Sequence, residues 1–506
     1  MKQSQVRAYH TRTKHAFDRY AAGPGTLDWD AQPKVFRDWD GAQLTLLPKE
    51  IAVYEISWGD IAQSRQALPL NVDNLGSLLR LCVGLTAWKE VAGTRWSLRA
   101  HPSSGNLHPT ETWIVATGVA GLEDGLYHYQ PLHHALARRA WGYSTQTTGL
   151  WMGLSSIHWR EAWKYGERAF RYCQLDTGHV LAAICYAAAL HGWRPRLLNL
   201  DSAEIARCLG LDREDDFAGV EGEEPEVMLA FDSAEVTLPD GWRHWAGMPS
   251  LLDARPLYQW PVIEEVAVAT RGSPPRSDAH HELVSSVQND IRAAQVILKR
   301  RSAQAFDGCS VMPNAVFRQI LRSLLPGGSP VWALWSLPAR VHPVLLVHRV
   351  EGVASGLYAM PRNESAQAAL QSALRNTFDW QSVEPDLSLY QLVAASAGKA
   401  ARTLSCHQEI ASACAVTFMM VAEFAAPVER EAAAYRHLHW EAGMLGQVIT
   451  LEAEAAGWRG TGIGCFFDDA DHELLGLKDD QFQVIYHYAV GMALDDPRIS
   501  TLPAYR

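Results

Sequence analysis

Residues 102–109, with the sequence PSSGNLHP, carry the side chains best suited to hold a polar ligand. The hydroxyls of Ser103 and Ser104 and the amide of Asn106 offer hydrogen-bond donors and acceptors, and Gly105 gives the backbone unusual freedom. The segment holds neither a nucleophile with a base beside it nor a set of metal ligands. We therefore expect it to bind a flat, polar heterocycle that would itself carry the chemistry.

A second candidate site is the basic segment 299–307, KRRSAQAFD, which follows the amphipathic stretch 287–298. Arginines and a serine at a helix end can hold a phosphate group through guanidinium and hydroxyl hydrogen bonds. The alternative is a basic helix end that complements the helix dipole.

Residues 460–466, GTGIGCF, form a third candidate. Glycines at this spacing would let backbone amides approach a ring or a phosphate closely. The alternative is an ordinary turn between a helix and a strand.

Composition and charge set the broad class of protein. At 506 residues the chain exceeds one ordinary core, so about two to four domains are expected. The net charge of −11 argues against a nucleic-acid partner, and no run approaches the roughly 20 apolar residues of a membrane span. The N-terminus lacks the apolar segment of a signal peptide, so we expect a cytoplasmic protein. The eight cysteines form no CxxC pair, which favours small buried thiols in a reducing compartment.

An internal repeat is the strongest organisational signal in the sequence. Residues 170–194 and 435–459 align without a gap, because every matched pair is separated by 265 positions (436 − 171 = 459 − 194). Coincidence between alanine-rich helices would not also align an arginine, an acid and a glycine, so the repeat indicates a duplicated domain. The matched pairs are Arg171 with Arg436, Asp176 with Glu441, Gly178 with Gly443 and Gly192-Trp193-Arg194 with Gly457-Trp458-Arg459, and shorter echoes pair His108-Pro109 with His342-Pro343 and Gly125-Leu126-Tyr127 with Gly356-Leu357-Tyr358.

The repeated segments also indicate the elements that must position these motifs. Each is alanine-rich and ends in Gly-Trp-Arg, which predicts a long, largely buried helix with a glycine C-cap. Short β-branched or aromatic runs between helical stretches predict strands, and no G-x-G-x-x-G follows a strand as in a Rossmann domain. The polar, proline-containing stretch 271–282 predicts a linker, and the coarse class is α+β. The predicted strands are 112–117 and 227–231 in the first half and 344–348, 416–421 and 482–489 in the second.

Taken together, the motifs resemble those of a known family. R-R-S-x-x-x-F-D at 300–307, P-S-S-x-N-x-x-P at 102–109 and the glycines of 460–466 are similar to the flavin-binding signatures of the nitroreductase family. The fuller strings PSSGNLHPTE, GLYHY and RAFRYxxxDxGH resemble the SagB/thiazoline-oxidase branch, FMN-dependent dehydrogenases best known for oxidising azoline rings in modified peptides. The resemblance implies an α+β fold of two tandem nitroreductase-like domains packed as an intramolecular pseudo-dimer. We place the domains at 1–265 and 283–506, with a linker at 266–282.

Members of this family usually bind FMN between two subunits, one giving the R-R-S and glycine segments and the other P-S-S-x-N. Here the first half keeps P-S-S-G-N but has no R-R-S, its nearest candidate being residues 36–41 (FRDWDG), and residues 194–198 (RPRLL) lack the glycines. The second half keeps R-R-S and G-T-G-I-G, but residues 336–343 (SLPARVHP) lack the serine pair and the asparagine. Because the losses are complementary, we expect one FMN site between the halves, the other having decayed.

The resemblance implies a role for each matched residue. The arginines and serine of R-R-S would hold the phosphate and ribityl chain, the P-S-S-x-N segment would reach the isoalloxazine from the opposite half, and the glycine segment would lie along the flavin's polar edge. Gln304 stands where many relatives carry a basic residue, and Arg498 is a further phosphate candidate. The predicted cofactor-binding residues are Pro102, Ser103, Ser104, Asn106, Arg300, Arg301, Ser302, Gln304, Gly462, Ile463, Gly464 and Arg498.

Lys164 and Tyr165 resemble a Lys-Tyr pair that azoline oxidases use near the flavin. A desolvated lysine could act as a general base, removing a proton while hydride passes to the flavin. The alternative is that residues 159–168 (WREAWKYGER) pack the domain interface through structural ion pairs of Arg160, Arg168, Arg171, Glu161 and Glu167.

The leading hypothesis is an FMN-dependent oxidoreductase that dehydrogenates, or in the opposite direction reduces, a small-molecule or peptide-derived heterocycle. The alternatives are an NAD(P)H-dependent nitro- or quinone reductase and a non-catalytic flavin-binding scaffold or partner subunit. The substrate, the electron donor or acceptor, and any association beyond the pseudo-dimer are left open by the sequence.

Overall fold

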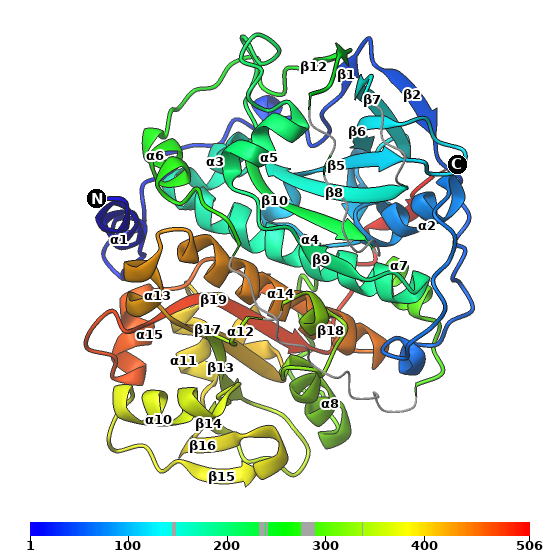
Figure 1. Cartoon of the computed structure of the whole chain (residues 1–506). Coiled ribbons are helices and arrows are strands. Elements are labelled where there is room, and N and C mark those ends of the chain that lie inside the picture. Colours follow the sequence, from blue (N-terminus) through cyan, green and yellow to red (C-terminus); the bar gives the residue numbers. More distant parts are fainter. Residues whose placement is uncertain (144–147, 232–237, 239–240, 275–288, 336, 506) are drawn as a thin grey trace.

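Two halves of similar architecture lie one above the other in Figure 1, the N-terminal half coloured blue to green and the C-terminal half yellow to red. Each half is built on an antiparallel sheet, and two long helices, α4 (Ala169–His191) and α14 (Ala434–Ala455), lie between the sheets. The architecture is α+β, as predicted. The computed structural model describes residues 1–143, 148–231, 238, 241–274, 289–335 and 337–505 of the chain.

The strands of the two main sheets follow the same order, which confirms the duplication. All five predicted strands are present, although the third ends at Val347, one residue before its predicted end. The first sheet runs β11 (His244–Trp245), β7 (Ala135–Trp141), β6 (Gly125–Gln130), β5 (Thr110–Thr117), β8 (Gly149–Ser156), β10 (Glu224–Phe231) and β9 (Pro195–Leu197), with β2 (Gln43–Leu46) also paired to β7. The second runs β15 (Gln381–Glu384), β16 (Leu389–Ala394), β14 (Gly356–Ala359), β13 (Val341–Val347), β17 (Val416–Glu423), β19 (Phe482–Gly491) and β18 (Arg459–Ile463).

The repeat extends to single hydrogen bonds. Tyr127 in β6 donates its hydroxyl to the carbonyl of Glu123 at 2.6 Å. Tyr358 in β14 donates to the carbonyl of Ala354 at the same distance, also four residues upstream. The Gly-Leu-Tyr echo of the sequence therefore marks equivalent strands in the two halves.

Helices α4 and α14 form the contact between the halves. A Cβ atom on Gly178 would overlap the carbonyl oxygen of Trp440, and one on Gly443 would overlap that of Leu175. The matched glycines thus let the two helix backbones touch, which explains why both repeats keep them. One hydrophobic core runs through both halves around this contact. Gly192, in the left-handed conformation with φ +70°, ends α4 as predicted.

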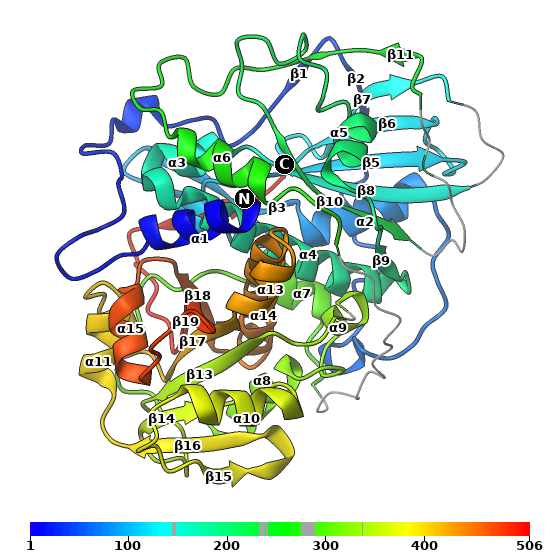
Figure 2. The same ribbon diagram turned by 60° about the vertical axis from the view of Figure 1, so that its left-hand side comes forward.

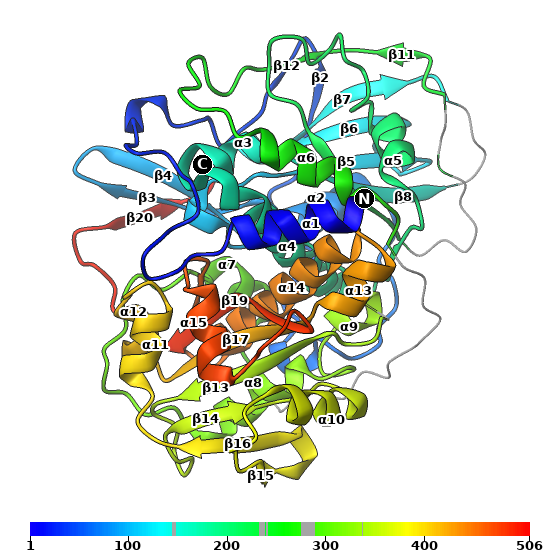
Figure 3. The same cartoon turned by 90° about the vertical axis from the view of Figure 1, so that its left-hand side faces the viewer.

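The chain termini cross between the halves. Helix α1 (Lys2–Arg12) lies against the second half, where the His10 ring bonds Gln483 at 3.0 Å. At the other end, β20 (Ser500–Pro503) pairs with β3 (Leu85–Val91) in a three-stranded sheet completed by β4 (Thr94–Arg99), where red and blue strands lie together in Figure 3. These exchanges tie the two domains into one body.

Helix α6 (Pro261–Ala269) corrects part of the predicted linker 266–282. The last four residues of α6, 266–269, fall within that linker, and Val266, Ala267 and Ala269 among them are buried. Helix α6 lies beside α1, as Figure 2 shows. Residues 275–282 of the linker lie outside the described residues. The boundaries at 1–265 and 283–506 remain predictions.

Helices α1 and α6 occupy equivalent places in the two repeats. The hydroxyl of Thr13, just after α1, accepts a hydrogen bond from Arg171 at 3.0 Å. The hydroxyl of Thr270, just after α6, accepts one from Arg436, the repeat partner of Arg171, at 2.9 Å. This equivalence favours a second repeat that begins at α6 rather than after it.

Several of the remaining helices pack against α4 or α14, and others pack on strands of the two sheets. Within the described residues, no helix is long and apolar enough to cross a membrane. The elements not yet named are β1 (Trp39–Asp40), β12 (Met248–Pro249), α2 (Val72–Cys82), α3 (His158–Tyr165), α5 (Ser202–Leu209), α7 (Ala293–Lys299), α8 (Asn314–Leu324), α9 (Val331–Leu334), α10 (Glu364–Ala373), α11 (Gly398–Leu404), α12 (Ile410–Ala413), α13 (Ala425–Arg430) and α15 (Asp468–Leu475).

Candidate functional site

A cavity of about 1020 Å³ lies where the two halves meet. The first half lines it with residues 101–106, which precede β5, and with side chains from α3 and α4. The second half contributes residues 300–304 after α7 and residues 461–465 along and beyond β18. The fold thus brings together segments that the sequence predicts on opposite sides of one site, while the role of each residue remains a prediction. The predicted residues that line the cavity are Pro102, Ser103, Ser104, Asn106, Lys164, Tyr165, Arg300, Arg301, Ser302, Gln304, Gly462, Ile463 and Gly464.

The loop 102–109 is braced by its own polar side chains. Gly105 and Asn106 have φ of +60°, a left-handed conformation that glycine and asparagine tolerate better than other residues. The Asn106 amide donates to the carbonyl of Ser97 at 2.9 Å, and its oxygen lies 3.0 Å from His108 Nε2. The amide of Asn106 therefore stabilises the loop itself. The predicted role of Asn106 is contact with a flavin.

Lys164 and Tyr165 approach this loop from α3. A Cβ atom on Gly105 would lie 2.6 Å from Tyr165 Oη and 3.2 Å from Lys164 Nζ. Burial lowers the pKa of Lys164, partly countered by the charge of Glu161 one helical turn away. Burial also raises the pKa of Tyr165 well above its ordinary value. The pair thus lies at the cavity wall, with an amine that gives up its proton more readily than an exposed lysine.

The predicted structural ion pairs around α3 form in part, but with distant partners rather than among themselves. Arg168 and Arg171 share the carboxylate of Asp468 at 2.9 and 2.8 Å. Arg160 pairs with Glu111 at 2.5 Å, and Glu167 pairs with Arg12. Glu161 takes part in none of the ion pairs of the described residues.

Arg300 is buried at the end of α7 and bridges the two halves. Its guanidinium donates to the carbonyls of Ala100 at 2.9 Å and Arg99 at 3.0 Å, both in the first half. Burial, together with the charge of Arg301, lowers the pKa of Arg300 to about 10. Arg301 is less buried and donates to Thr86 at 3.2 Å, so it is the arginine of the pair with more freedom to meet an anion.

The alternative interpretation of the glycine segment 460–466 as an ordinary turn is wrong for residues 460–463, which belong to the edge strand β18. Its glycines are needed because tyrosine rings approach the strand closely. A Cβ atom on Gly462 would collide with the hydroxyl of Tyr486, and one on Gly464 with the ring of Tyr172. The strand pairs with β19. This pairing depends on tertiary contacts, so the glycine content of the segment alone does not predict it.

Arg498, a predicted phosphate ligand, does not line the cavity. Its exposed side chain instead pairs with Asp496 at 2.6 Å, because the two residues lie on the same bend of the tail. Two further cationic side chains, Lys89 and Arg459, line the cavity and are not among the predicted site residues. Arg459 belongs to the repeated Gly-Trp-Arg motif, so the repeat itself carried a signal for it.

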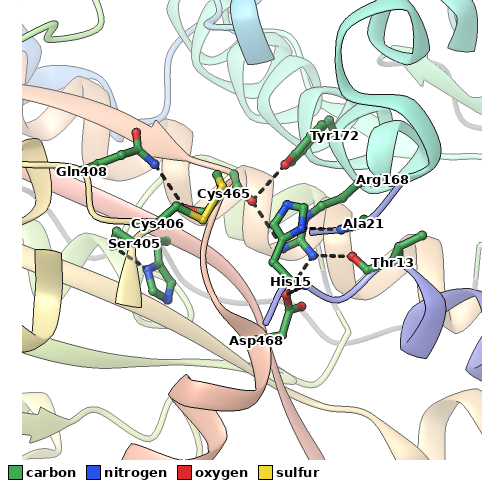
Figure 4. Close-up of a disulfide and its surroundings, with 12 residues drawn as sticks. Thr13, His15, Ala21, Arg168, Tyr172, Ser405, Cys406, Gln408, Cys465 and Asp468 are labelled. Carbon is green, nitrogen blue, oxygen red and sulfur yellow. Dashed lines mark hydrogen bonds and ion pairs between the residues drawn. A yellow bond between two sulfur atoms is a disulfide. The ribbon is translucent and has the colours of Figure 1, made fainter. Parts of the chain in front are cut away.

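A disulfide joins Cys406 to Cys465 at the cavity wall, as Figure 4 shows. The expectation of free, buried thiols is wrong for this pair, because folding brings two cysteines 59 residues apart to a Cα–Cα distance of 5.8 Å. Tyr172 and Arg168 point towards the same segment, where both donate to the carbonyl oxygen of Gly464. The disulfide and these two hydrogen bonds hold the chain just after β18 in place.

In the second half, the acid that corresponds to Asp176 is paired with a cation. Glu441, the repeat partner of Asp176, accepts hydrogen bonds from the backbone N–H groups of Arg340 and Val341 and pairs with the buried guanidinium of Arg362. The guanidinium of Arg362 lies 4.3 Å from the ring of Trp332. Arg362 thus neutralises Glu441, whereas Asp176 has no cationic partner among the ion pairs of the described residues. Of the degenerate segment 336–343, Ser336 lies outside the described residues.

Residues 36–41, the predicted R-R-S counterpart of the first half, are not part of a site of this kind. Arg37 is buried, and its guanidinium donates to the carbonyl of Glu221 at 2.9 Å. It therefore connects two segments of its own half. None of the residues 36–41 lines the cavity.

Comparison with known proteins identifies a family domain and a shared fold. Residues 297–492 match the model of the nitroreductase family. The chain carries a nitroreductase family domain. A crystal structure of a putative nitroreductase from Anabaena variabilis superposes on 97% of this chain and 99% of its own, with a TM-score of 0.70 and 22% sequence identity. The tandem fold is therefore shared over nearly the whole length.

Sequence relatives match parts of the chain. Trifolitoxin-processing protein TfxB of Rhizobium leguminosarum is 30% identical over 142 residues, 24% of this chain and 38% of TfxB. Indigoidine synthase of Dickeya dadantii is 28% identical over 165 residues, 29% of this chain and 10% of the synthase. A putative nitroreductase of Methanocaldococcus jannaschii is 25% identical over 147 residues, 25% of this chain and 71% of that protein. The matches thus span 10% and 38% of the two larger relatives, so they concern a domain and not those whole proteins.

Proposed function

We propose that this protein is an FMN-dependent oxidoreductase that holds one FMN in the cavity between its halves. The observation that carries the proposal is the meeting of two motifs, 102–106 and 300–304, at one cavity although they lie about two hundred residues apart in the chain. Neither motif can form the site without the other. The nitroreductase family domain and the shared tandem fold support a flavin as the occupant.

The side chains present fit such a group. The cavity volume of about 1020 Å³ lies at the upper end of ordinary ligand pockets, roughly 300–1,000 Å³. Two buried nitrogens at its wall, Arg99 Nε and His101 Nε2, have no hydrogen-bond partner within the described part of the chain. Buried polar atoms, donors and acceptors alike, are normally satisfied, so these two atoms indicate a polar ligand.

We assign the cationic end of the cavity to the phosphate. Arg301 and Ser302 would hold it, with Lys89 and Arg459 adding charge from the two halves. Arg300 would act mainly by fixing this segment to the first half. The wall made by the loop 102–106, Gly462 and Gly464 would face the ring system.

When bound, FMN supplies a two-electron acceptor at N5. The chain must then orient the substrate, exclude water and accept a proton. Lys164 is suited to that last task because its lowered pKa leaves more of it as the free amine, and Tyr165 fixes its approach to the loop.

We propose a peptide-derived or small heterocycle of the azoline type as the substrate. The motif strings around the cavity and the likeness to a toxin-processing protein support this class. The alternative, reduction of nitro compounds or quinones with NAD(P)H, is supported by the likeness to a putative nitroreductase. Anaerobic mixing distinguishes them, since bleaching of the flavin band by a thiazoline peptide favours the first and bleaching by NAD(P)H the second. Bleaching by neither, in a protein that dithionite reduces, would indicate a flavin-binding scaffold.

FMN content tests the single site. Purified full-length protein, loaded with FMN and freed of excess, should hold one flavin per chain, and two per chain would contradict the proposal. Arg301→Ala should weaken FMN binding about 10- to 100-fold, the loss of a charge-assisted hydrogen bond. Arg498→Ala is the matched control, because Arg498 does not line the cavity and pairs only locally. Equal effects of the two substitutions would refute the assignment of the phosphate end.

A further inference from the structure

Asp176 is a buried carboxylate at the cavity wall. It lies on α4, is 2% exposed, and accepts hydrogen bonds from the backbone N–H of Ser104 at 3.1 Å and from the Ser104 hydroxyl at 3.2 Å. Among the described residues, no arginine, lysine or histidine nitrogen lies within ion-pair distance of it. A buried carboxylate bound only by neutral donors is poorly compensated when charged, so it can take up a proton at modest cost.

A second carboxyl group lies behind Asp176. Glu161 on α3 is fully buried, and neither of its side-chain oxygens has a hydrogen-bond partner in the described part of the molecule. An unpaired buried charge is costly, so burial favours the protonated form of Glu161. Burial and the neighbouring Asp176 raise its pKa well above the ordinary range. A negative charge on Asp176 therefore disfavours ionisation of Glu161.

The repeat supplies an internal comparison. Glu441 occupies the position of Asp176 in α14, 265 residues later, and there the carboxylate is neutralised by Arg362. The fold can thus place a cation against this position. The cavity leaves Asp176 without one, although Arg99, Arg300 and Lys164 all line the same cavity.

We propose that Asp176 exchanges protons with the ligand of the cavity through the hydroxyl of Ser104, with Glu161 as the buried acid behind it. A proton from the ligand arrives at Ser104 Oγ while the hydroxyl's own proton moves to Asp176 Oδ1. The ligand loses one proton, the carboxylate becomes the acid, and no electrons move in this step. The inference deepens the proposed function and rests on it, because it adds a route beside Lys164 by which a proton can leave the ligand.

The surroundings of Asp176 fit a group that titrates near neutrality. Burial raises its pKa to about 7, against the lowering effect of the hydrogen bonds from Ser103 and Ser104. The titratable groups that face it are Glu161, Lys164 and Tyr165 from α3, Tyr486 from β19, and Cys173 and His179 on its own helix.

The test uses the full chain loaded with FMN and follows carboxyl protonation by infrared difference spectroscopy between pH 5 and 9. We expect a protonated-carboxyl band with a midpoint near 7 that changes when dithionite reduces the flavin, and that is absent in Asp176→Asn. Glu452→Gln is the matched control. Glu452 is a buried acid on α14 whose pKa burial likewise raises to about 7, but it bonds Trp58 and Gln319 and does not line the cavity. A redox-sensitive band that survives Asp176→Asn would overturn the proposal.

The Ser104→Ala substitution distinguishes a proton relay through the hydroxyl from a purely structural contact with Asp176. The substitution keeps the backbone hydrogen bond to Asp176 and removes the hydroxyl, so the Asp176 band should remain. The pH-dependent step of anaerobic flavin reduction by substrate should slow at least about 10-fold, the usual contribution of one proton-transfer group. An unchanged rate would remove the relay. If no FMN binds at all, the proposed function fails, whereas the carboxyl titration of Asp176 in the FMN-free chain still decides whether this acid behaves as inferred.

Discussion

The Gly105→Ala substitution tests whether Lys164 and Tyr165 act on the cavity. The added Cβ atom would lie 2.6 Å from Tyr165 Oη, where ordinary contact begins near 3.4 Å, so the hydroxyl must retreat by about 0.8 Å (3.4 − 2.6). Lys164 Nζ, at 3.2 Å, must also give way slightly. A displacement of about 1 Å at a catalytic group can cost on the order of 100-fold in rate. We therefore expect turnover to fall 10- to 100-fold, about 1.4–2.7 kcal/mol in the activation free energy.

The matched control is Gly93→Ala in the turn between β3 and β4. Gly93 also has a left-handed φ, +85°, but no atom lies within 4 Å of its added Cβ. Both substitutions carry the cost of placing an L residue in this conformation, about 1–2 kcal/mol of stability, whereas only Gly105→Ala displaces the Lys-Tyr pair. The difference between the two variants therefore isolates the displacement.

The assay has two parts, FMN per chain from the flavin absorbance and the single-turnover rate of flavin reduction by a thiazoline peptide. We expect full FMN content in both variants and a slow rate in Gly105→Ala alone. Equal rates in the two variants would refute the reasoning, since the position of the pair would then not matter to the chemistry. A loss of FMN confined to Gly105→Ala would instead show that the loop acts through cofactor binding.

Three further predictions concern the surroundings of the site. Lys164→Ala should keep the flavin but lose dehydrogenation, and unchanged turnover in a rapid-mixing assay would exclude its role as a base. Cys406→Ser removes the disulfide and should lower the free energy of unfolding by about 2–4 kcal/mol in urea titrations under oxidising conditions, with no difference after reduction. Burial raises the pKa of Asp468, but the charges of Arg168 and Arg171 outweigh it and the net pKa is well below the ordinary range. Its folded pKa is depressed, so this stabilisation is present above about pH 4 and is lost as the pH falls further, and an acid-induced drop in melting temperature should be smaller in Asp468→Asn.

The sequence predicts the repeated framework well because its signals are local or periodic. The 265-residue offset identifies α4 and α14, and the matched glycines turn out to be the points where the two helix backbones touch. The motifs at 102–106 and 300–304 meet because the duplication imposes a two-domain contact on a single chain. For these features, the residues that form the sequence pattern are the ones that the packing of the two halves requires.

The errors arise where distant partners decide the local structure. The glycines of 460–464 look like a flexible turn, but pairing with β19 makes most of them an edge strand, and tyrosines from elsewhere explain the missing side chains. Arg498 pairs with its near neighbour Asp496 and does not line the cavity. The partners of a cysteine or a buried acid are likewise set by the tertiary fold, so neither the disulfide nor the unpaired state of Glu161 can be read from spacing.

The pairing of Glu441 with Arg362 distinguishes the second half from the first, where the equivalent acid, Asp176, lies at the cavity wall. In a dimer of identical subunits, any side chain that enters one site enters both. Once the halves are fused they change independently, and Arg362 can pair with Glu441 over Trp332 without closing the cavity. Removing one partner of such a buried pair costs about 3–5 kcal/mol, so a single substitution there would destabilise the protein. The two halves therefore differ at this position: Glu441 is paired in the second half, whereas in the first half buried polar atoms, Arg99 Nε and the Glu161 oxygens among them, have no hydrogen-bond partner among the described residues.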